Sequence, residues 1–251
     1  MIFRRSAQSE DWLSLSSPEG EILVITAAGL CPWPPILARE LTGIDPVIPE
    51  LRASCAEVID RLIRTAPDAV VVVGPAADTQ VWTSYDHLDL SLFAPMRSVA
   101  TSSLPAPLGL GAYLLDRANY DRRRVLQAVG SNESVNNCVK LGRTFASSSD
   151  RLALLVMGDG SARRSVKAPG HLDPRAEPFD AAVAQAIATS DFAALEQLDS
   201  GLARELMVTG VAPWQVLSGA MKSITTRTDM LYADAPFGVM YFVALFMPAH
   251  S

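Results

Sequence analysis

A short apolar run, Leu152–Met157, ends abruptly in a polar turn, and this feature constrains the fold more than any other in the chain. Six consecutive apolar residues are typical of a strand covered on both faces, as in the parallel sheets of α/β proteins. The turn that follows, residues 158–161, reads GDGS. Because open α/β sheets bind ligands at the carboxyl ends of their strands, Asp159 and Ser161 are the first candidates for a site.

Other apolar runs predict further strands of the same sheet. The first two stop at a glycine, Gly29 and Gly74, as the central run stops at Gly158. Since parallel strands end at one edge of a sheet, this shared pattern predicts that the three strand ends converge. Strands are expected at 21–28, 69–73, 124–129 and 238–246, and 77–98 is expected to be a long loop or hairpin.

Apolar residues at three- and four-residue spacing predict helices between the strands. The clearest stripe runs through 48–62 and places Cys55 in the core, and Ser131 or Asn132 is expected to cap the helix at 131–146. The alternation of strands and helices predicts an α/β fold with a central, mostly parallel or mixed sheet flanked by helices. The expected helices are 36–41, 48–62, 104–117, 131–146, one that begins near Pro178, 192–198, 200–208 and 213–222.

The composition fits a single domain of this kind. The chain has 251 residues, 49% of them hydrophobic, and a formal net charge of -6. We expect one domain at 21–248, preceded by an N-terminal extension at 1–20 that lacks the apolar core of a signal peptide. The acidic balance argues against nucleic acid or an anionic membrane as a partner. Three cysteines without metal-type spacing favour a reducing compartment, so the expected location is the cytoplasm.

Two segments around the central run resemble a known family. Residues 157–162 (MGDGSA) are similar to the Ser-Gly-Asp-Leu-Ser-His-like turn of the class III extradiol dioxygenase superfamily, the group around the catalytic subunit of protocatechuate 4,5-dioxygenase and the Memo-like proteins. Residues 169–183 (PGHLDPRAEPFDAAV) resemble the Pro-Gly-Tyr-Asp-Pro-Arg-like loop and following helix of that family, with His171 near the place of the usual tyrosine. The resemblance implies a class III extradiol dioxygenase-like domain.

The same resemblance implies that the iron site of the family is degenerate here. Active members bind iron through histidines in a His-Pro-Pro-like and a Ser-Pro-His-like motif, and use a third histidine as catalytic acid/base. The corresponding positions in this chain are Trp33, Ala76 and Ala162, and none of its three histidines stands at any of them. Ring cleavage needs two histidines and a carboxylate on the iron, so the resemblance speaks for the fold more than for the chemistry.

Several candidate residues keep two interpretations. Trp33 is either an aromatic plug against the proline-rich turn or a wall of a ligand pocket, and His87 is either a surface residue or a compensating metal ligand. Asp159 is either a turn residue or a base, and Ser161 lacks the partner that a nucleophile needs. Arg163 belongs either to a solvated loop or to an anion site. The pocket candidates are Cys31, Trp33, Ala76, Asp78, His87, Asp159, Ser161, Ala162 and Arg163.

The predicted function follows from these residues and from the resemblance. Trp33, Ala76 and residues 159–163 are expected to share one cleft. We expect a binding module for an unknown small molecule or protein, with the iron ligands lost, no cofactor and no dioxygenase activity. The alternative is an Fe(II)-dependent extradiol ring-cleavage dioxygenase, or a related oxidoreductase, that uses non-standard ligands. Neither nucleic acid nor a membrane is an expected partner, and a homo-oligomer is left open.

Overall fold

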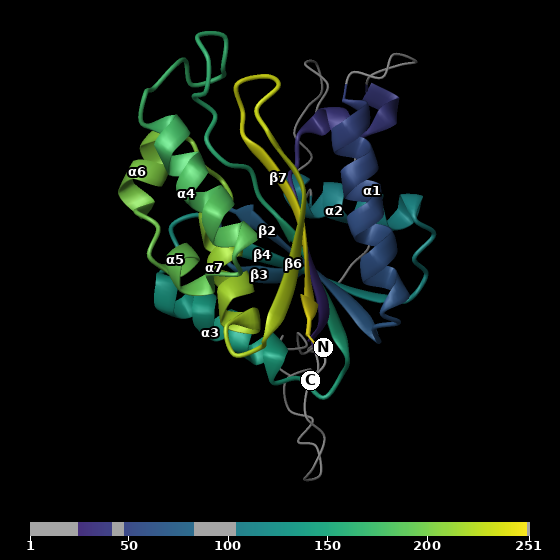
Figure 1. The fold of residues 1–251 in the computed structure, drawn as a ribbon. Coiled ribbons are helices and arrows are strands. Elements are labelled where there is room, and N and C mark those ends of the chain that lie inside the picture. The colour runs from purple at the N-terminus through teal and green to yellow at the C-terminus, as the bar shows by residue number, and fades with distance from the viewer. Residues whose placement is uncertain (1–24, 42–47, 83–103, 250–251) are drawn as a thin grey trace, which may run out of the picture.

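A computed structural model describes residues 25–41, 48–82 and 104–249, which form one seven-stranded sheet with helices on both faces (Figure 1). The strand order is β3-β4-β2-β5-β1-β7-β6, where the strands are β1 (Ile25–Cys31), β2 (Ala69–Ala76), β3 (Gln80–Trp82), β4 (Arg123–Gly130), β5 (Leu152–Met157), β6 (Thr226–Asp234) and β7 (Tyr241–Pro248). Strands β4, β2, β5 and β1 pair in parallel, and β3, β7 and β6 pair antiparallel with their neighbours. The predicted α/β fold with a mixed central sheet is confirmed.

The central strand β5 has the bounds that its apolar run predicts, but the predicted ends of β1 and β2 are wrong. β1 continues through Gly29 to Cys31, and β2 continues through Gly74 to Ala76. Both glycines serve close packing instead of ending a strand. A Cβ atom at Gly29 would lie 2.5 Å from Val58 Cγ1, so the missing side chain lets a helix approach the sheet.

The antiparallel strands differ most from the sequence-based prediction. The final strand is confirmed as β7, although it begins three residues later than predicted, and β3 lies within the predicted loop or hairpin at 77–98. Residues 83–103 lie outside the described residues. β6 has no counterpart among the predicted strands. It is an edge strand with charged residues such as Arg227 and Asp229 and a bulge between Met230 and Tyr232, so its only apolar run is the short one at 230–233.

Two helices cover one face of the sheet, α1 (Pro49–Arg64) and α2 (Ala106–Arg117). The stripe predicted at 48–62 is confirmed as the buried side of α1, and Cys55 is fully buried there. The helix predicted at 36–41 consists of two 3-10 turns, η1 (Pro35–Leu37) and η2 (Arg39–Leu41). Within the described ranges, no helix is long and apolar enough to cross a membrane.

The other face carries the remaining helices, α3 (Val135–Ala146), α4 (Ala176–Ala188), α5 (Phe192–Glu196), α6 (Ser200–Glu205) and α7 (Val211–Met221) (Figure 1). All were predicted, but the predicted cap of α3 was wrong. Ser134 caps this helix, since its Oγ accepts a hydrogen bond from the Asn137 amide (3.2 Å). Ser131 instead bonds back to the carbonyl oxygen of Ala76 through its amide and its hydroxyl, and so prolongs the strand region.

The topology brings several strand ends to one edge of the sheet. Because β1, β2, β4 and β5 are parallel, their carboxyl ends lie together, and Cys31 pairs with Met157 at the ends of β1 and β5. The chain leaves β1 toward α1 on one face and leaves β5 toward α4 on the other. The predicted convergence of strand ends is therefore confirmed, while the shared cleft stays a prediction.

Candidate functional site

The turns after β1 and β5 are joined by a hydrogen bond between the two residues that the sequence marks most strongly. The backbone N–H of Trp33 donates to Oδ1 of Asp159 at 2.9 Å. Asp159 is only 9% exposed, and Trp33 is half-buried. Open α/β sheets place ligands at this edge, so the junction of Trp33 and Asp159 is our candidate site.

A third residue, Thr209, fixes the geometry of this junction from the loop between α6 and α7. Its Oγ1 accepts hydrogen bonds from the indole Nε1–H of Trp33 (3.0 Å) and from the backbone N–H of Asp159 (3.1 Å). In return, the amides of Thr209 and Gly210 donate to the carbonyl oxygen of Asp159. Both N–H groups of Trp33 thus donate hydrogen bonds within this junction. Sequence reasoning missed Thr209, because nothing local marks a lone threonine fifty residues from its partner.

Burial gives the Asp159 carboxyl unusual acid–base behaviour. Desolvation raises its pKa from the usual 3.8 to about 7, against the opposing effect of the Trp33 amide. Both protonation states are therefore populated near neutral pH. A buried carboxyl in this condition can serve as an acid, a base or a recognition group whose strength depends on pH.

Among the residues that the structure describes, the groups that lie near Asp159 bring no positive charge. A hydrogen bond with Cys31 and burial raise the pKa of the Cys55 thiol well above its usual value, and the Asp159 charge adds to this effect. Burial and the Asp159 charge also raise the pKa of Tyr241, which sequence reasoning did not single out. Cys31, Cys55 and Tyr241 are all buried, and none of the three side chains can carry a positive charge.

Ser161 belongs to a different cluster of buried polar groups. Its amide donates to Oδ1 of Asp180 (2.9 Å) and its hydroxyl to Oδ2 (2.5 Å), and Arg164 reaches the same Oδ2 at 3.3 Å. Ser161 is 0% exposed and Asp180 is 1% exposed. Backbone hydrogen bonds join Met240 to Gly160 and Ser161 at 2.8 Å each. The serine hydroxyl is therefore committed to holding the loop in place.

In the part of the chain that the structure describes, the remaining pocket candidates make no hydrogen bond or ion pair with Asp159. Ala162 is buried, and its amide bonds to the carbonyl oxygen of Leu206. Arg163 donates to the carbonyl oxygen of Gly170 (2.5 Å), Ala76 is half-buried and Asp78 is exposed. His87 lies outside the described residues.

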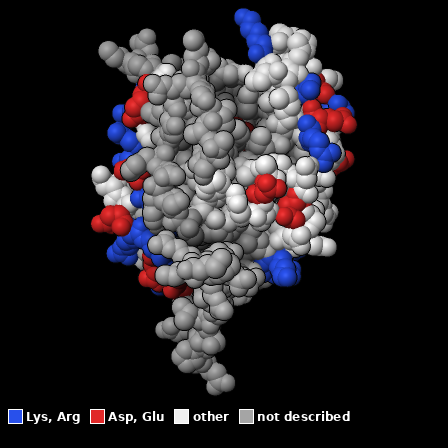
Figure 2. All heavy atoms as spheres, turned by 180° about the vertical axis from the view of Figure 1, so that it is seen from behind, with Lys and Arg blue, Asp and Glu red and all other residues white. Residues whose placement is uncertain are grey.

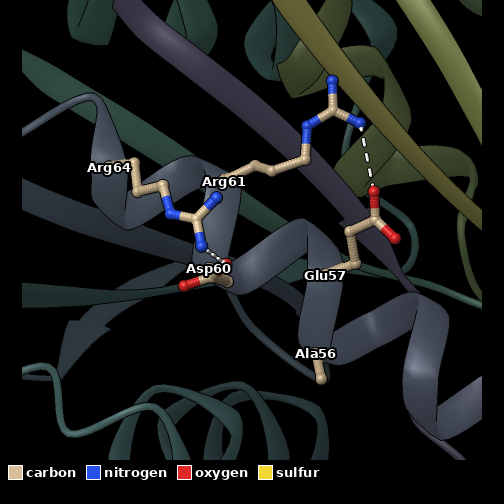
Figure 3. A pocket seen from close by; sticks show the side chains of 5 residues that line it. All are labelled: Ala56, Glu57, Asp60, Arg61 and Arg64. Carbon is tan, nitrogen blue, oxygen red and sulfur yellow. Dashed lines mark ion pairs between the residues drawn. The ribbon is translucent and has the colours of Figure 1, made fainter.

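A hollow beside α1 is a weaker candidate. It is lined by Ala56, Glu57, Asp60, Arg61 and Arg64 (Figure 3). Its charges are already paired, since Arg61 lies 3.6 Å from Glu57 and Arg64 lies 2.5 Å from Asp60. Such exposed pairs one helical turn apart are ordinary features of a solvated helix, so the hollow offers no free charge to a ligand.

The surface charge is mixed. Figure 2 shows the side of the molecule that faces away in Figure 1, and on its described part acidic and basic side chains are interspersed without a broad region of either sign. This face therefore gives no electrostatic reason to expect a nucleic acid there.

The residues at the positions implied for iron do not fit a metal. Trp33 has no lone pair to offer, since its indole N–H is a donor that already bonds to Thr209, and Ala76 carries only a methyl group. Ala162, at the position implied for the catalytic acid/base, cannot transfer a proton either. In the part of the chain that the structure describes, no group of three or more His, Cys, Asp or Glu residues could hold a metal ion. We therefore derive no chemistry through iron.

No protein-family model matches the chain, and no curated protein matches it either. Among solved structures, the chain is similar to the uncharacterized protein JW3007 from Escherichia coli K12, with a TM-score of 0.53 and 18% sequence identity. The match covers 88% of this chain and 99% of that one. At this identity the likeness shows the fold alone.

Proposed function

We propose that this protein binds a small molecule at the carboxyl edge of its sheet, beside Asp159 and Trp33, and that it does not hold iron there. On this proposal it is a class III extradiol dioxygenase-like protein whose iron site is degenerate. The three cysteines of the chain are free and buried, which suits a role in the cytoplasm.

The observation that carries the proposal is the state of Asp159. The carboxyl of a residue that is only 9% exposed, with a pKa raised to about 7, costs folding free energy when it ionises. Such a cost is common where a group serves binding or catalysis, because selection for stability alone would replace it. Its place at the carboxyl edge of parallel strands, beside a half-buried tryptophan, is where a ligand site is expected in this class of fold.

The first test asks whether iron binds. The protein is incubated anaerobically with Fe(II), freed of unbound metal and analysed for bound iron, and oxygen uptake is followed with catechol. We expect iron far below one equivalent per chain and no oxygen uptake. Oxygen uptake that is lost on chelation and restored by Fe(II) would contradict the proposal and support a dioxygenase with non-standard ligands.

The second test asks whether Asp159 matters for binding. Aromatic probes of different charge are titrated while the indole N–H signal of Trp33 is followed by NMR, with Trp33→Phe used to assign it. We expect one class of probe to shift this signal, and Asp159→Asn to weaken that effect. Asp60→Asn is the matched control, since it makes the same chemical change in an exposed ion pair on α1. If no probe shifts the signal at millimolar concentration, the proposed site is wrong.

A further inference from the structure

We propose that the ligand of this site carries a protonated amine, whose ammonium group lies between the carboxylate of Asp159 and the indole of Trp33. This inference rests on the proposed function, which it deepens by naming the chemical class of the ligand. Three observations carry it: the missing counter-charge at Asp159, the position of Trp33, and the neutral character of the surrounding groups.

Asp159 lacks the cation that a buried carboxylate normally requires. Across residues 25–41, 48–82 and 104–249, its carboxyl accepts one hydrogen bond, from the amide of Trp33, and makes no ion pair. The two arginines that follow in the chain are engaged elsewhere. Arg163 bonds to Gly170, and Arg164 pairs with Asp180 and Glu177. A buried carboxylate is stable only when it is paired or protonated, so an incoming cation would complete the site.

Trp33 supplies the second element of an ammonium site. Its amide donates to the carboxyl of Asp159 and its indole nitrogen donates to Thr209, whose hydroxyl also accepts from the Asp159 amide, so Trp33 is anchored at both ends to the same junction. The side chain is half-buried and keeps part of its surface accessible. The face of an indole attracts cations more strongly than that of any other aromatic side chain, and aromatic faces are used in proteins to recognise ammonium groups.

The other titratable groups near Asp159 favour a cationic ligand over an anionic one. They are Cys31 on β1, Cys55 on α1, and Tyr241 on β7, with Tyr232 on β6 beside Tyr241. Each is neutral or negative in every protonation state. A carboxylate or phosphate group would meet repulsion from the ionised Asp159 and no compensating cation, whereas an ammonium group would meet only favourable charges.

Protonation of Asp159 should then compete with the amine. At pH 5 the carboxyl, with a pKa of about 7, is mostly neutral, and at pH 8 it is mostly ionised. An alkyl amine stays protonated across this range. Its affinity should therefore rise by about tenfold or more between pH 5 and pH 8, while that of a neutral analogue should not rise.

The experiment uses three probes of nearly one shape: 2-phenylethylamine, 2-phenylethanol and phenylacetate. Each is titrated into the full chain at pH 5 and pH 8 while the Trp33 indole signal is followed. We expect the amine to bind, to bind about tenfold or more tightly at pH 8, and to lose about tenfold in affinity in Asp159→Asn but not in Asp60→Asn. The wild-type pH profile provides a test even if the Asp159→Asn variant does not fold.

The outcomes separate this inference from the function on which it rests. If the alcohol or the acid binds as tightly as the amine, or if amine affinity is unchanged between pH 5 and pH 8, the amine inference is overturned while binding at the site stands. If none of the three probes shifts the Trp33 signal, the inference and the proposed site are both overturned.

Discussion

Two buried carboxyl groups, Asp159 and Asp180, lie on either side of one loop and differ in what surrounds them. Asp180 accepts hydrogen bonds from the amide and hydroxyl of Ser161 and pairs with Arg164. Within the described part of the chain, the Asp159 carboxyl accepts a single hydrogen bond, from the amide of Trp33. Burial raises the pKa of both groups, but only at Asp180 do an arginine and a hydroxyl oppose the effect.

This difference in partners separates a carboxyl that stabilises the loop from one that could still pair with a ligand. A buried ion pair with saturated hydrogen bonds fixes one conformation, and breaking it is costly. A buried carboxyl with one hydrogen bond weakens the fold when it ionises, and it gains from any ligand that neutralises it. We therefore assign Asp180 to structure, whereas a role of Asp159 in binding is our proposal.

The largest expected effect is at the structural carboxyl. Asp180→Asn removes the charge that Arg164 faces and replaces an acceptor oxygen by an amide that points at the donors of Ser161. We expect the free energy of unfolding to fall by about 3 to 5 kcal/mol in urea denaturation. Asp60→Asn, in an exposed pair, should cost less than about 1 kcal/mol. Equal costs for the two variants would remove the basis for calling Asp180 structural.

The carboxyl of Asp159 should have the opposite effect on stability, because its negative charge weakens the fold as the pH rises. The pKa of Asp159 is near 3.8 in the unfolded chain and about 7 in the folded one. Between these two values the carboxyl is protonated in the folded chain and ionised in the unfolded chain. Its contribution to stability is present below pH 4 and is lost as the pH rises to 7 and beyond. That loss is up to about 4 kcal/mol.

Asp159→Asn should abolish this pH dependence, because an amide does not ionise. Other carboxyl groups titrate in the same interval, so the quantity to measure is the difference in unfolding free energy between variant and wild type. We expect that difference to move in favour of the variant by about 2 to 4 kcal/mol from pH 4 to pH 8. A difference that stays constant with pH would show that ionisation of Asp159 costs no folding free energy.

Much of the fold could be predicted from the sequence, because burial on both faces leaves a continuous apolar run. This signal located β5 with its correct bounds and α1 through its stripe. It failed where a residue serves another purpose. Gly29 and Gly74 resemble strand ends but allow helices to approach, and the half-buried edge strand β6 has only a short apolar run, at 230–233.

The site was only partly predictable. Trp33 and Asp159 follow buried strands, so the rule for parallel sheets placed both at one edge, and the structure joins them. The different roles of Asp159 and Ser161 could not be read from their shared turn, since they depend on Asp180 and Thr209, which arrive from distant parts of the chain. Long-range contacts of single polar residues leave no periodic signal in a sequence.

Ser161→Ala should have a smaller effect on the free energy of unfolding, and it distinguishes a role in stability from a role in binding. The substitution removes one hydrogen bond to the buried Asp180 and keeps the amide contact and the Arg164 pair. We expect a loss of about 1 to 2 kcal/mol in unfolding free energy. The affinity of the site for its ligand should be unchanged, because the hydroxyl is fully buried and faces the other carboxyl. A large loss of affinity without loss of stability would place Ser161 in the binding site.

The smallest expected change in stability comes from Trp33→Phe. This variant loses the indole hydrogen bond to Thr209 but keeps an aromatic ring and the backbone donor to Asp159. Unfolding free energy should fall by about 1 kcal/mol, since Thr209 retains its bond from the Asp159 amide.

Binding provides the stronger comparison at this position, because a phenyl ring attracts cations less than an indole does and a leucine side chain does so hardly at all. We expect amine affinity to fall about two- to fivefold in Trp33→Phe and about tenfold in Trp33→Leu, measured by calorimetry at pH 8. The alcohol analogue should not follow this order, since it carries no charge for the ring to attract. If the two variants weaken the amine equally, the ring of Trp33 acts only by packing, and the ammonium group rests on Asp159 alone.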